Sequence, residues 1–229
     1  MLELFPRGVE DLGDRYAVYT DDEGEQVVRE HFANVDSQSI AEGWEEAWRE
    51  FHHGIVLGRF WVGPPWEQRQ APDGIEVIAI DPGRAFGTGA HATTRLCLEL
   101  LQELEPTSLL DVGCGSGVLS IAAARLGFEP VTGVDNEADA VETTLVNAQA
   151  NGVEVAAHRA DALTADLPSV GVVVANIALE PVERLLPRLD APLAVTSGYL
   201  ERDEPVVDGW QRIDRRDREG WAADLFRRA

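Results

Sequence analysis

Residues 109–120 read LLDVGCGSGVLS, and this stretch decides the fold. A short apolar run reaches the acidic residue Asp111, a turn with three glycines follows, and an apolar stretch with helical spacing begins at Val118. This order predicts a strand, a tight loop and a helix. Glycines let the backbone turn sharply and let a ligand approach closely, and the start of the helix offers unpaired N–H groups at the loop.

The spacing of the glycines separates two classes of nucleotide ligand. A dinucleotide fingerprint needs its third glycine at 118, where Val118 stands. A pyrophosphate site also requires a helix start without nearby negative charge, because the phosphates are themselves negative. Asp111 at the strand end instead favours a ligand with positive charge. Asp135 ends the next apolar run, 135 − 115 = 20 residues after Gly115, where a carboxylate can accept hydrogen bonds from a ribose. A nucleoside with a cationic group and no phosphate is S-adenosylmethionine.

Composition narrows the class of protein. With 229 residues, one α/β domain with a small appendage is expected. The formal net charge of -22 comes from 41 acidic and 19 basic residues, and every basic residue is arginine. Such a surface repels nucleic acids and anionic membranes and attracts a basic partner, although solubility or a salty habitat would favour the same acidity. Without a visible signal peptide or membrane span, we expect a cytoplasmic protein without a metal site.

The chain is expected to form two parts. Residues 1–62 would be a small N-terminal α+β lobe with a bridging helix at 40–51, residues 63–74 a linker, and 75–229 the main domain. In the main domain, apolar runs alternate with helical stretches, which predicts a doubly wound α/β sheet. The expected strands are 75–80, 109–112, 130–134, 153–157, 170–175 and 192–197, with a closing antiparallel pair at 210–214 and 220–226; the expected helices are 95–104, 118–126, 136–150 and 182–189.

Two further stretches carry polar residues at positions suited to a ligand. Residues 81–94 hold three glycines, two adjacent threonines, one histidine and one phenylalanine, which is typical of a ligand loop and predicts a lid that the cofactor orders. Asn176 follows the nearly unbroken apolar run 170–175, and Asp161 follows the strand at 153–157. Both positions lie where open α/β sheets bind ligands, and Asp161 or its backbone is placed to meet an adenine edge.

At these residues the sequence resembles the ribosomal protein L11 methyltransferase (PrmA) family of class I S-adenosylmethionine enzymes. The matching stretches are 81–94, 111–117, 133–135 and 173–177, and the likeness runs from about residue 44 to the end. The resemblance implies a Rossmann-like class I methyltransferase sheet and cofactor contacts from Thr94, Gly113, Asp135 and Asn176. It also implies that Phe86, Thr88 and His91 close over the ligand. Together with the spacing above, the expected cofactor contacts are Phe86, Gly87, Thr88, Thr94, Asp111, Gly113, Gly115, Asp135, Asp161 and Asn176.

The chemistry expected of this family needs no strong base. An uncharged amine attacks the methyl group, and positioning supplies most of the rate. The carbonyl oxygen of Asn176 can accept from the amine N–H and aim its lone pair, while the proton leaves to solvent or to His91. We therefore expect Asn176 and His91 to be the catalytic residues.

The target is less clearly indicated than the chemistry. The family methylates lysine or N-terminal amines of a ribosomal protein and presents it with a full N-terminal α/β lobe, whereas only about 40 residues precede the expected helix at Trp44. Arg84, Ala90 and Ala92 also depart from the usual loop. Methylation of another protein, methylation of a small-molecule amine, and a non-catalytic nucleoside-binding role therefore stay open, and no oligomeric state is indicated.

Overall fold

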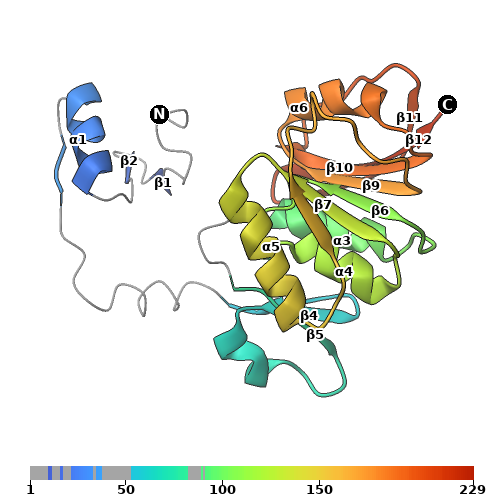
Figure 1. Ribbon diagram of the computed structural model, residues 1–229, viewed down its shortest axis with the longest axis horizontal. Helices are drawn as coiled ribbons and strands as arrows, with labels where there is room; N and C mark the ends of the chain where they lie inside the picture. Colours follow the sequence, from blue (N-terminus) through green and yellow to red (C-terminus); the bar gives the residue numbers. More distant parts are fainter. Residues whose placement is uncertain are drawn as a thin grey trace. The chain divides into compact units, whose positions relative to one another are not determined.

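The computed structural model describes residues 10–11, 16–17, 22–32, 35–37, 53–81, 89 and 91–229. The chain divides into two compact units, Met1–Glu50 and Phe51–Ala229 (Figure 1). In the first unit, β1 (Glu10–Asp11) pairs antiparallel with β2 (Tyr16–Ala17), and α1 spans Asp22–His31. The expected bridging helix at 40–51 lies outside the described residues.

A seven-stranded sheet forms the centre of the second unit. Its order is β11-β12-β10-β9-β6-β7-β8, with β12 antiparallel to both of its neighbours. Strands β8, β7, β6, β9 and β10 run parallel, and the chain reverses its direction of winding at β6. The predicted doubly wound α/β fold is therefore confirmed. The strands are β6 (Leu109–Val112), β7 (Val131–Asp135), β8 (Ala156–Arg159), β9 (Val172–Asn176), β10 (Leu193–Leu200), β11 (Trp210–Arg218) and β12 (Trp221–Arg228).

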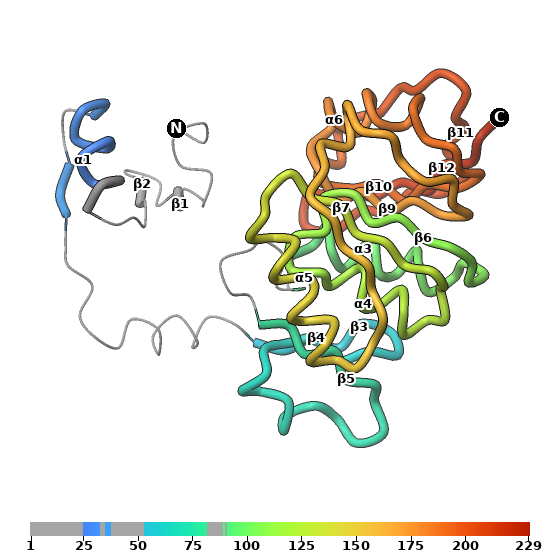
Figure 2. Tube along the Cα trace, viewed as in Figure 1, coloured from blue at the N-terminus to red at the C-terminus, as the bar shows by residue number. Residues whose placement is uncertain are grey.

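Helices cover both faces of this sheet (Figure 2). Alternate residues of β9 face opposite sides: Val172 and Val174 pack with leucines of α3 and α4, while Val173 packs with Val182 and Leu185 of α6. This burial on both faces explains the nearly unbroken apolar run of the strand. The helices are α3 (Ala92–Leu101), α4 (Val118–Leu126), α5 (Ala138–Ala150) and α6 (Leu179–Leu185), the last continued by a 3-10 helix, η2 (Leu186–Arg188).

A smaller sheet precedes α3 in the same unit. Strands β3 (Ile55–Leu57), β4 (Phe60–Gly63) and β5 (Glu76–Ala79) form it, with the 3-10 helix η1 (Pro65–Gln70) between β4 and β5. Its buried side chains share one core with α3 and α4, and β4 pairs in parallel with β5. The structure thus differs from the expected division at 62, because residues 63–74 connect two strands of one sheet rather than two domains.

A bulge in β10 fits the end of this strand closely against the residue that follows β9. The register of β10 on β12 shifts between Ser197 and Tyr199. Gly198 lies in the bulge with a φ of 100°, and a Cβ atom there would lie 2.2 Å from the carbonyl oxygen of Ile177. Only glycine avoids both the backbone strain and this clash.

We expect Gly198→Ala to lower the free energy of unfolding by roughly 2–4 kcal/mol, since the new methyl group would push against backbone atoms. Gly209→Ala is the matched control, because Gly209 also has a positive φ of 78° but has nothing within 4 Å of a Cβ atom. The control should lose only about 1 kcal/mol from backbone strain. Urea denaturation measures both, and equal losses would contradict the close packing of β10 against Ile177.

Candidate functional site

The carboxyl ends of three parallel strands meet at one edge of the sheet. In the hydrogen-bonding register, Val112 of β6 lies between Val134 of β7 and Ala175 of β9. The next residue along β7 is Asp135, and the next along β9 is Asn176. The structure therefore brings these two predicted site residues to either side of the glycine loop, at the switch point where open α/β sheets bind ligands.

The glycine loop, residues 113–117, is tied to the end of β7. The N–H of Gly113 donates to the carbonyl of Val134 at 2.8 Å, and the N–H of Gly115 donates to Oδ2 of Asp135 at 3.0 Å. Gly113 has a φ of 74°, and a Cβ atom there would lie 2.6 Å from Cγ2 of Ile177. A side chain at 113 would be strained and would clash with Ile177, so glycine lets the loop pack closely against the residue that follows β9.

Asp111 is a buried carboxylate beneath the glycine loop. Its side chain is 1% exposed, and Oδ2 accepts a hydrogen bond of 2.6 Å from Oγ of Ser120 in α4. Oδ1 is buried and accepts no hydrogen bond from the described residues. Loss of hydration raises the pKa of Asp111 to about 6, and the nearby Asp135 carboxylate adds to the rise. A carboxylate with an unsatisfied oxygen in this place suits a cationic ligand group.

Asp135 and the segment at Asp161 lie next to each other. Asp135 also accepts from the N–H of Glu137 through Oδ1 at 3.0 Å, so both carboxylate oxygens are held in place while keeping further lone pairs. The N–H of Ala160 donates to the backbone carbonyl of Asp135 at 2.8 Å, which brings the end of β8 to the site. The Asp161 carboxylate is exposed and accepts from the N–H of Leu163 at 2.9 Å, so it shapes its own turn.

Asn176 contacts the start of α3, 82 residues earlier in the chain. Its Nδ2 donates to Oγ1 of Thr94 at 3.3 Å, and Thr94 is 1% exposed. The sequence predicted a helix over 95–104 with Thr94 at its start, but α3 begins at Ala92. Thr94 therefore lies in the first turn, where its hydroxyl can point at the end of β9 rather than cap the helix.

His91 caps α3 instead. Its Nδ1 accepts from the N–H of Thr93 at 3.4 Å and lies 2.8 Å from Oγ1 of the same residue. Its ring packs edge-on against Trp221, with centroids 4.9 Å apart. Burial, with the positive charge of Arg95, lowers the pKa of His91, against the opposite effect of Glu219. The imidazole is thus neutral at pH 7.

Part of the expected site lies outside the described residues. Phe86, Gly87, Thr88 and most of the expected lid lie outside the described residues. Over the described parts of the chain, no helix is long and apolar enough to cross a bilayer, and no three or more His, Cys, Asp or Glu side chains form a metal-binding group. His53, which follows His52 in the sequence, contacts Glu67, with 2.9 Å between Nδ1 and Oε1.

Polar side chains of α5, which the sequence did not indicate as part of the site, donate hydrogen bonds to the glycine loop. Oγ1 of Thr144 donates to the carbonyl of Gly115 at 3.0 Å, and Nδ2 of Asn147 donates to the carbonyl of Ser116 at 2.9 Å. Thr144 is 0% and Asn147 is 2% exposed. The sequence did offer one signal for these residues: two polar residues lie three positions apart on the helix face that packs on the sheet.

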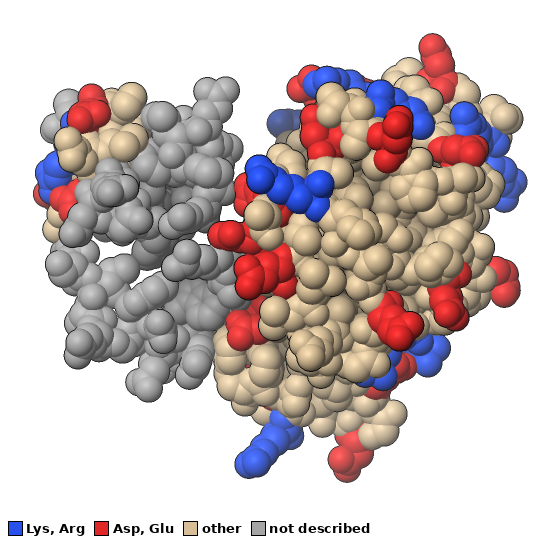
Figure 3. All heavy atoms as spheres, viewed as in Figure 1, with Lys and Arg blue, Asp and Glu red and all other residues tan. Residues whose placement is uncertain are grey.

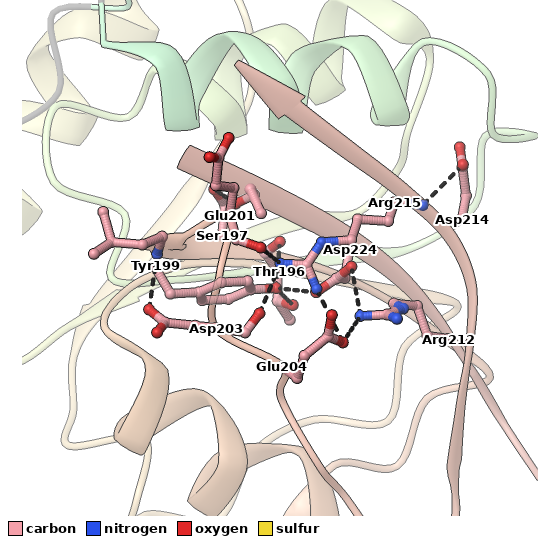
Figure 4. Close-up of polar contacts among 12 residues, drawn as sticks. Thr196, Ser197, Tyr199, Glu201, Asp203, Glu204, Arg212, Asp214, Arg215 and Asp224 are labelled. Atoms are coloured by element: carbon pink, nitrogen blue, oxygen red, sulfur yellow. Dashed lines mark hydrogen bonds and ion pairs between the residues drawn. The ribbon is translucent and has the colours of Figure 1, made fainter. Parts of the chain in front are cut away.

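A second missed group lies on the α6 side of the sheet (Figure 4). Asp224 of β12 is 0% exposed and accepts from the hydroxyl of Tyr199 at 2.9 Å. Arg212 and Arg215 of β11 each place a nitrogen 3.7 Å from one of its oxygens, and Glu204 pairs with both arginines. An aspartate within the apolar run of β12 was the sequence signal for this group.

We expect Asp111→Asn to be at least as stable as the wild type at pH 7. Because folding raises the pKa of Asp111, the wild type loses stability as the pH rises from about 4 to about 6, while asparagine does not titrate. The difference in unfolding free energy between variant and wild type should grow over that range by on the order of 2–3 kcal/mol. Urea midpoints from pH 4 to 7.5 measure it, and parallel profiles would contradict the burial of an ionised Asp111.

Comparisons with known proteins agree with this geometry. The model of the family described as ribosomal protein L11 methyltransferase (PrmA) matches residues 15–228. The ribosomal protein L11 methyltransferase of Geotalea uraniireducens (strain Rf4) is 38% identical over 213 residues, which cover 81% of this chain and 68% of that protein. The protein of the same description from Shewanella pealeana (strain ATCC 700345 / ANG-SQ1) is 41% identical over 210 residues, covering 80% and 71%.

Solved structures show the same fold. A ribosomal protein L11 methylase from Lactobacillus delbrueckii subsp. bulgaricus superposes with a TM-score of 0.69 at 28% identity, over 77% of this chain and 98% of that one. A putative RNA methyltransferase from Pyrococcus horikoshii, at 17% identity and a TM-score of 0.52 over 64% of this chain and 87% of that one, shares the fold alone. The expected Rossmann-like methyltransferase fold is thus confirmed. Because the family model spans nearly the whole sequence, the chain belongs to the ribosomal protein L11 methyltransferase (PrmA) family.

Proposed function

We propose that this methyltransferase binds S-adenosylmethionine at the ends of β6, β7 and β9 and methylates amines of ribosomal protein L11 in the cytoplasm. The observation that carries the proposal is the meeting of Asp111, the glycine loop, Asp135 and Asn176 at one sheet edge. The L11 methyltransferase names of the relatives support the choice of substrate.

The residues present fit this cofactor. Oδ1 of Asp111, which accepts no hydrogen bond from the described residues, suits a positively charged group. The Asp135 carboxylate, oriented by two backbone N–H groups, can accept from the ribose hydroxyls. Glycine at 113 lets the loop take a positive φ of 74° and lets Ile177 pack against it, so the backbone N–H groups of the loop stay at the sheet edge.

Asn176 is suited to orient the amine. When bound, S-adenosylmethionine supplies a methyl group on a positively charged sulfur, which an uncharged amine can attack. Because Nδ2 of Asn176 donates to Thr94, its Oδ1 is turned away from Thr94 and can accept from the amine N–H. Before the attack, the protonated amine loses a proton to solvent or to His91. The lowered pKa of His91 keeps its ring neutral, and its acceptor nitrogen Nδ1 would have to release the N–H of Thr93 to take that proton.

The surface charge suits a basic protein substrate. The formal net charge is -22, and acidic side chains are spread over the face of the second unit in Figure 3. Many of the basic side chains lie around α6, β11 and β12, and arginines of β11 are paired with Glu99, Glu103 and Glu204. A negative field of this kind speeds the approach of a basic partner.

Transfer of a labelled methyl group tests the proposal. Purified ribosomal protein L11, and separately a whole lysate, are incubated with the chain and labelled S-adenosylmethionine. Because the sequence contains no lysine, label in the band of the enzyme itself cannot be methyl-lysine. Label in L11 supports the proposal. Label in another protein or in small molecules supports the matching alternative, and cofactor binding without transfer would leave only a nucleoside-binding module.

We expect Asn176→Ala to lower kcat about a hundredfold with a smaller effect on cofactor affinity, since it removes an interaction made chiefly in the transition state. Asn176→Asp keeps the shape but adds a negative charge, which should keep cofactor binding and hold the amine protonated, so that activity shifts to higher pH. Single-turnover methylation across pH is the measurement. If both variants lose affinity but react at the wild-type rate at saturation, Asn176 is a cofactor contact only.

A further inference from the structure

Helix α5 turns a row of polar side chains toward the protein interior. Thr144, Asn147 and Asn151, which caps the helix, are 0%, 2% and 7% exposed. Buried amides and hydroxyls are costly unless they are hydrogen-bonded, so the partners of this row show what it is for. Figure 1 shows α5 running from the main sheet toward β4 and β5.

The two asparagines pair with the free edge of β5 and of the residues just after it, as a further strand would. Asn151 accepts from the N–H of Ala79 at 2.9 Å and donates to its carbonyl at 2.7 Å. Asn147 likewise accepts from the N–H of Asp81 and donates to its carbonyl, each at 3.1 Å. Four helix residues rise about 6 Å, close to the roughly 6.6 Å spanned by two strand residues, so the two amides match two successive sites along one strand edge.

Only Asn147 of this pair also reaches the glycine loop in the described contacts. The same Nδ2 that donates to Asp81 donates to the carbonyl of Ser116 at 2.9 Å. Asn151 instead donates to the backbone carbonyl of Asn147 at 2.8 Å and so supports the helix end. One amide therefore joins the glycine loop of the proposed cofactor site to the chain at Asp81, the first residue of the matching stretch 81–94.

We propose that Asn147 is a positioning residue for the cofactor site, which fixes the glycine loop against the chain at Asp81. Its loss removes hydrogen bonds to the Ser116 carbonyl and to Asp81 together, whereas loss of Asn151 removes those to Ala79 and to the backbone of Asn147. Asn147 thus contributes to cofactor affinity as well as to stability, and Asn151 contributes to stability alone. This inference rests on the proposed function of the same site.

The comparison of Asn147→Ala with Asn151→Ala tests this role. The full chain of each is titrated with S-adenosylmethionine by calorimetry, well below the melting temperature of both. We expect both to melt at lower temperature, but only Asn147→Ala to bind the cofactor more weakly, by roughly five- to tenfold, as loss of a hydrogen bond within a site predicts. Asp135→Ala removes the proposed ribose acceptor itself, so its loss of cofactor affinity shows how large the effect of a direct contact is.

A second pair of variants covers the case in which the alanine variants do not fold. Asn147→Asp and Asn151→Asp keep the acceptor for the strand N–H, lose the donor, and add the same charge one helical turn apart. Weaker cofactor binding by Asn147→Asp than by Asn151→Asp supports the proposal. Equal affinities within either pair overturn it. If the wild type itself does not bind S-adenosylmethionine, the proposed function fails instead, so the two failures are distinguishable.

Discussion

The burial of a carboxylate at the end of the central strand is the constraint on which this site depends. Asp111 lies at the switch point of the sheet, where the two halves wind apart, and is 1% exposed. Its pKa rises to about 6 because water is excluded. At neutral pH it still carries a charge that the described residues only partly satisfy, through Ser120. The fold thus tolerates the free-energy cost of a buried and only partly hydrogen-bonded charge, which a cationic ligand can offset.

The glycine loop above this carboxylate has few side chains of its own, so neighbouring elements must define it. Asp135 of β7 holds one of its N–H groups, while Thr144 and Asn147 of α5 hold two of its carbonyls. These partners lie 20 to 31 residues away in sequence. Glycine makes the close approach of a ligand sterically allowed, and the hydrogen bonds from outside the loop limit the freedom that glycine would otherwise leave.

The sequence predicted most of the second unit because its signals are local. Val118–Leu126 is a helix as expected, and Asp135 and Asn176 end strands as the apolar runs indicated. What it could not predict depends on tertiary contacts. The expected linker 63–74 connects two strands of a small sheet, in which Phe60 and Ile78 share a core with α3. The α5 asparagines have partners 66 and 72 residues away, which no local pattern shows.

The two most buried aspartates of the sheet differ in the positive charge that the described residues place beside them. Asp224 forms ion pairs with Arg212 and Arg215, each with a nitrogen 3.7 Å from a carboxylate oxygen. It also accepts a hydrogen bond from the hydroxyl of Tyr199. Arg215 also donates to the carbonyls of Glu201 and Asp203, so this group fastens the loop after β10 to the closing hairpin. Asp111 has no arginine partner among the described ion pairs. Folding thus supplies a counter-charge to Asp224, whereas at Asp111 the proposed cofactor would bring it.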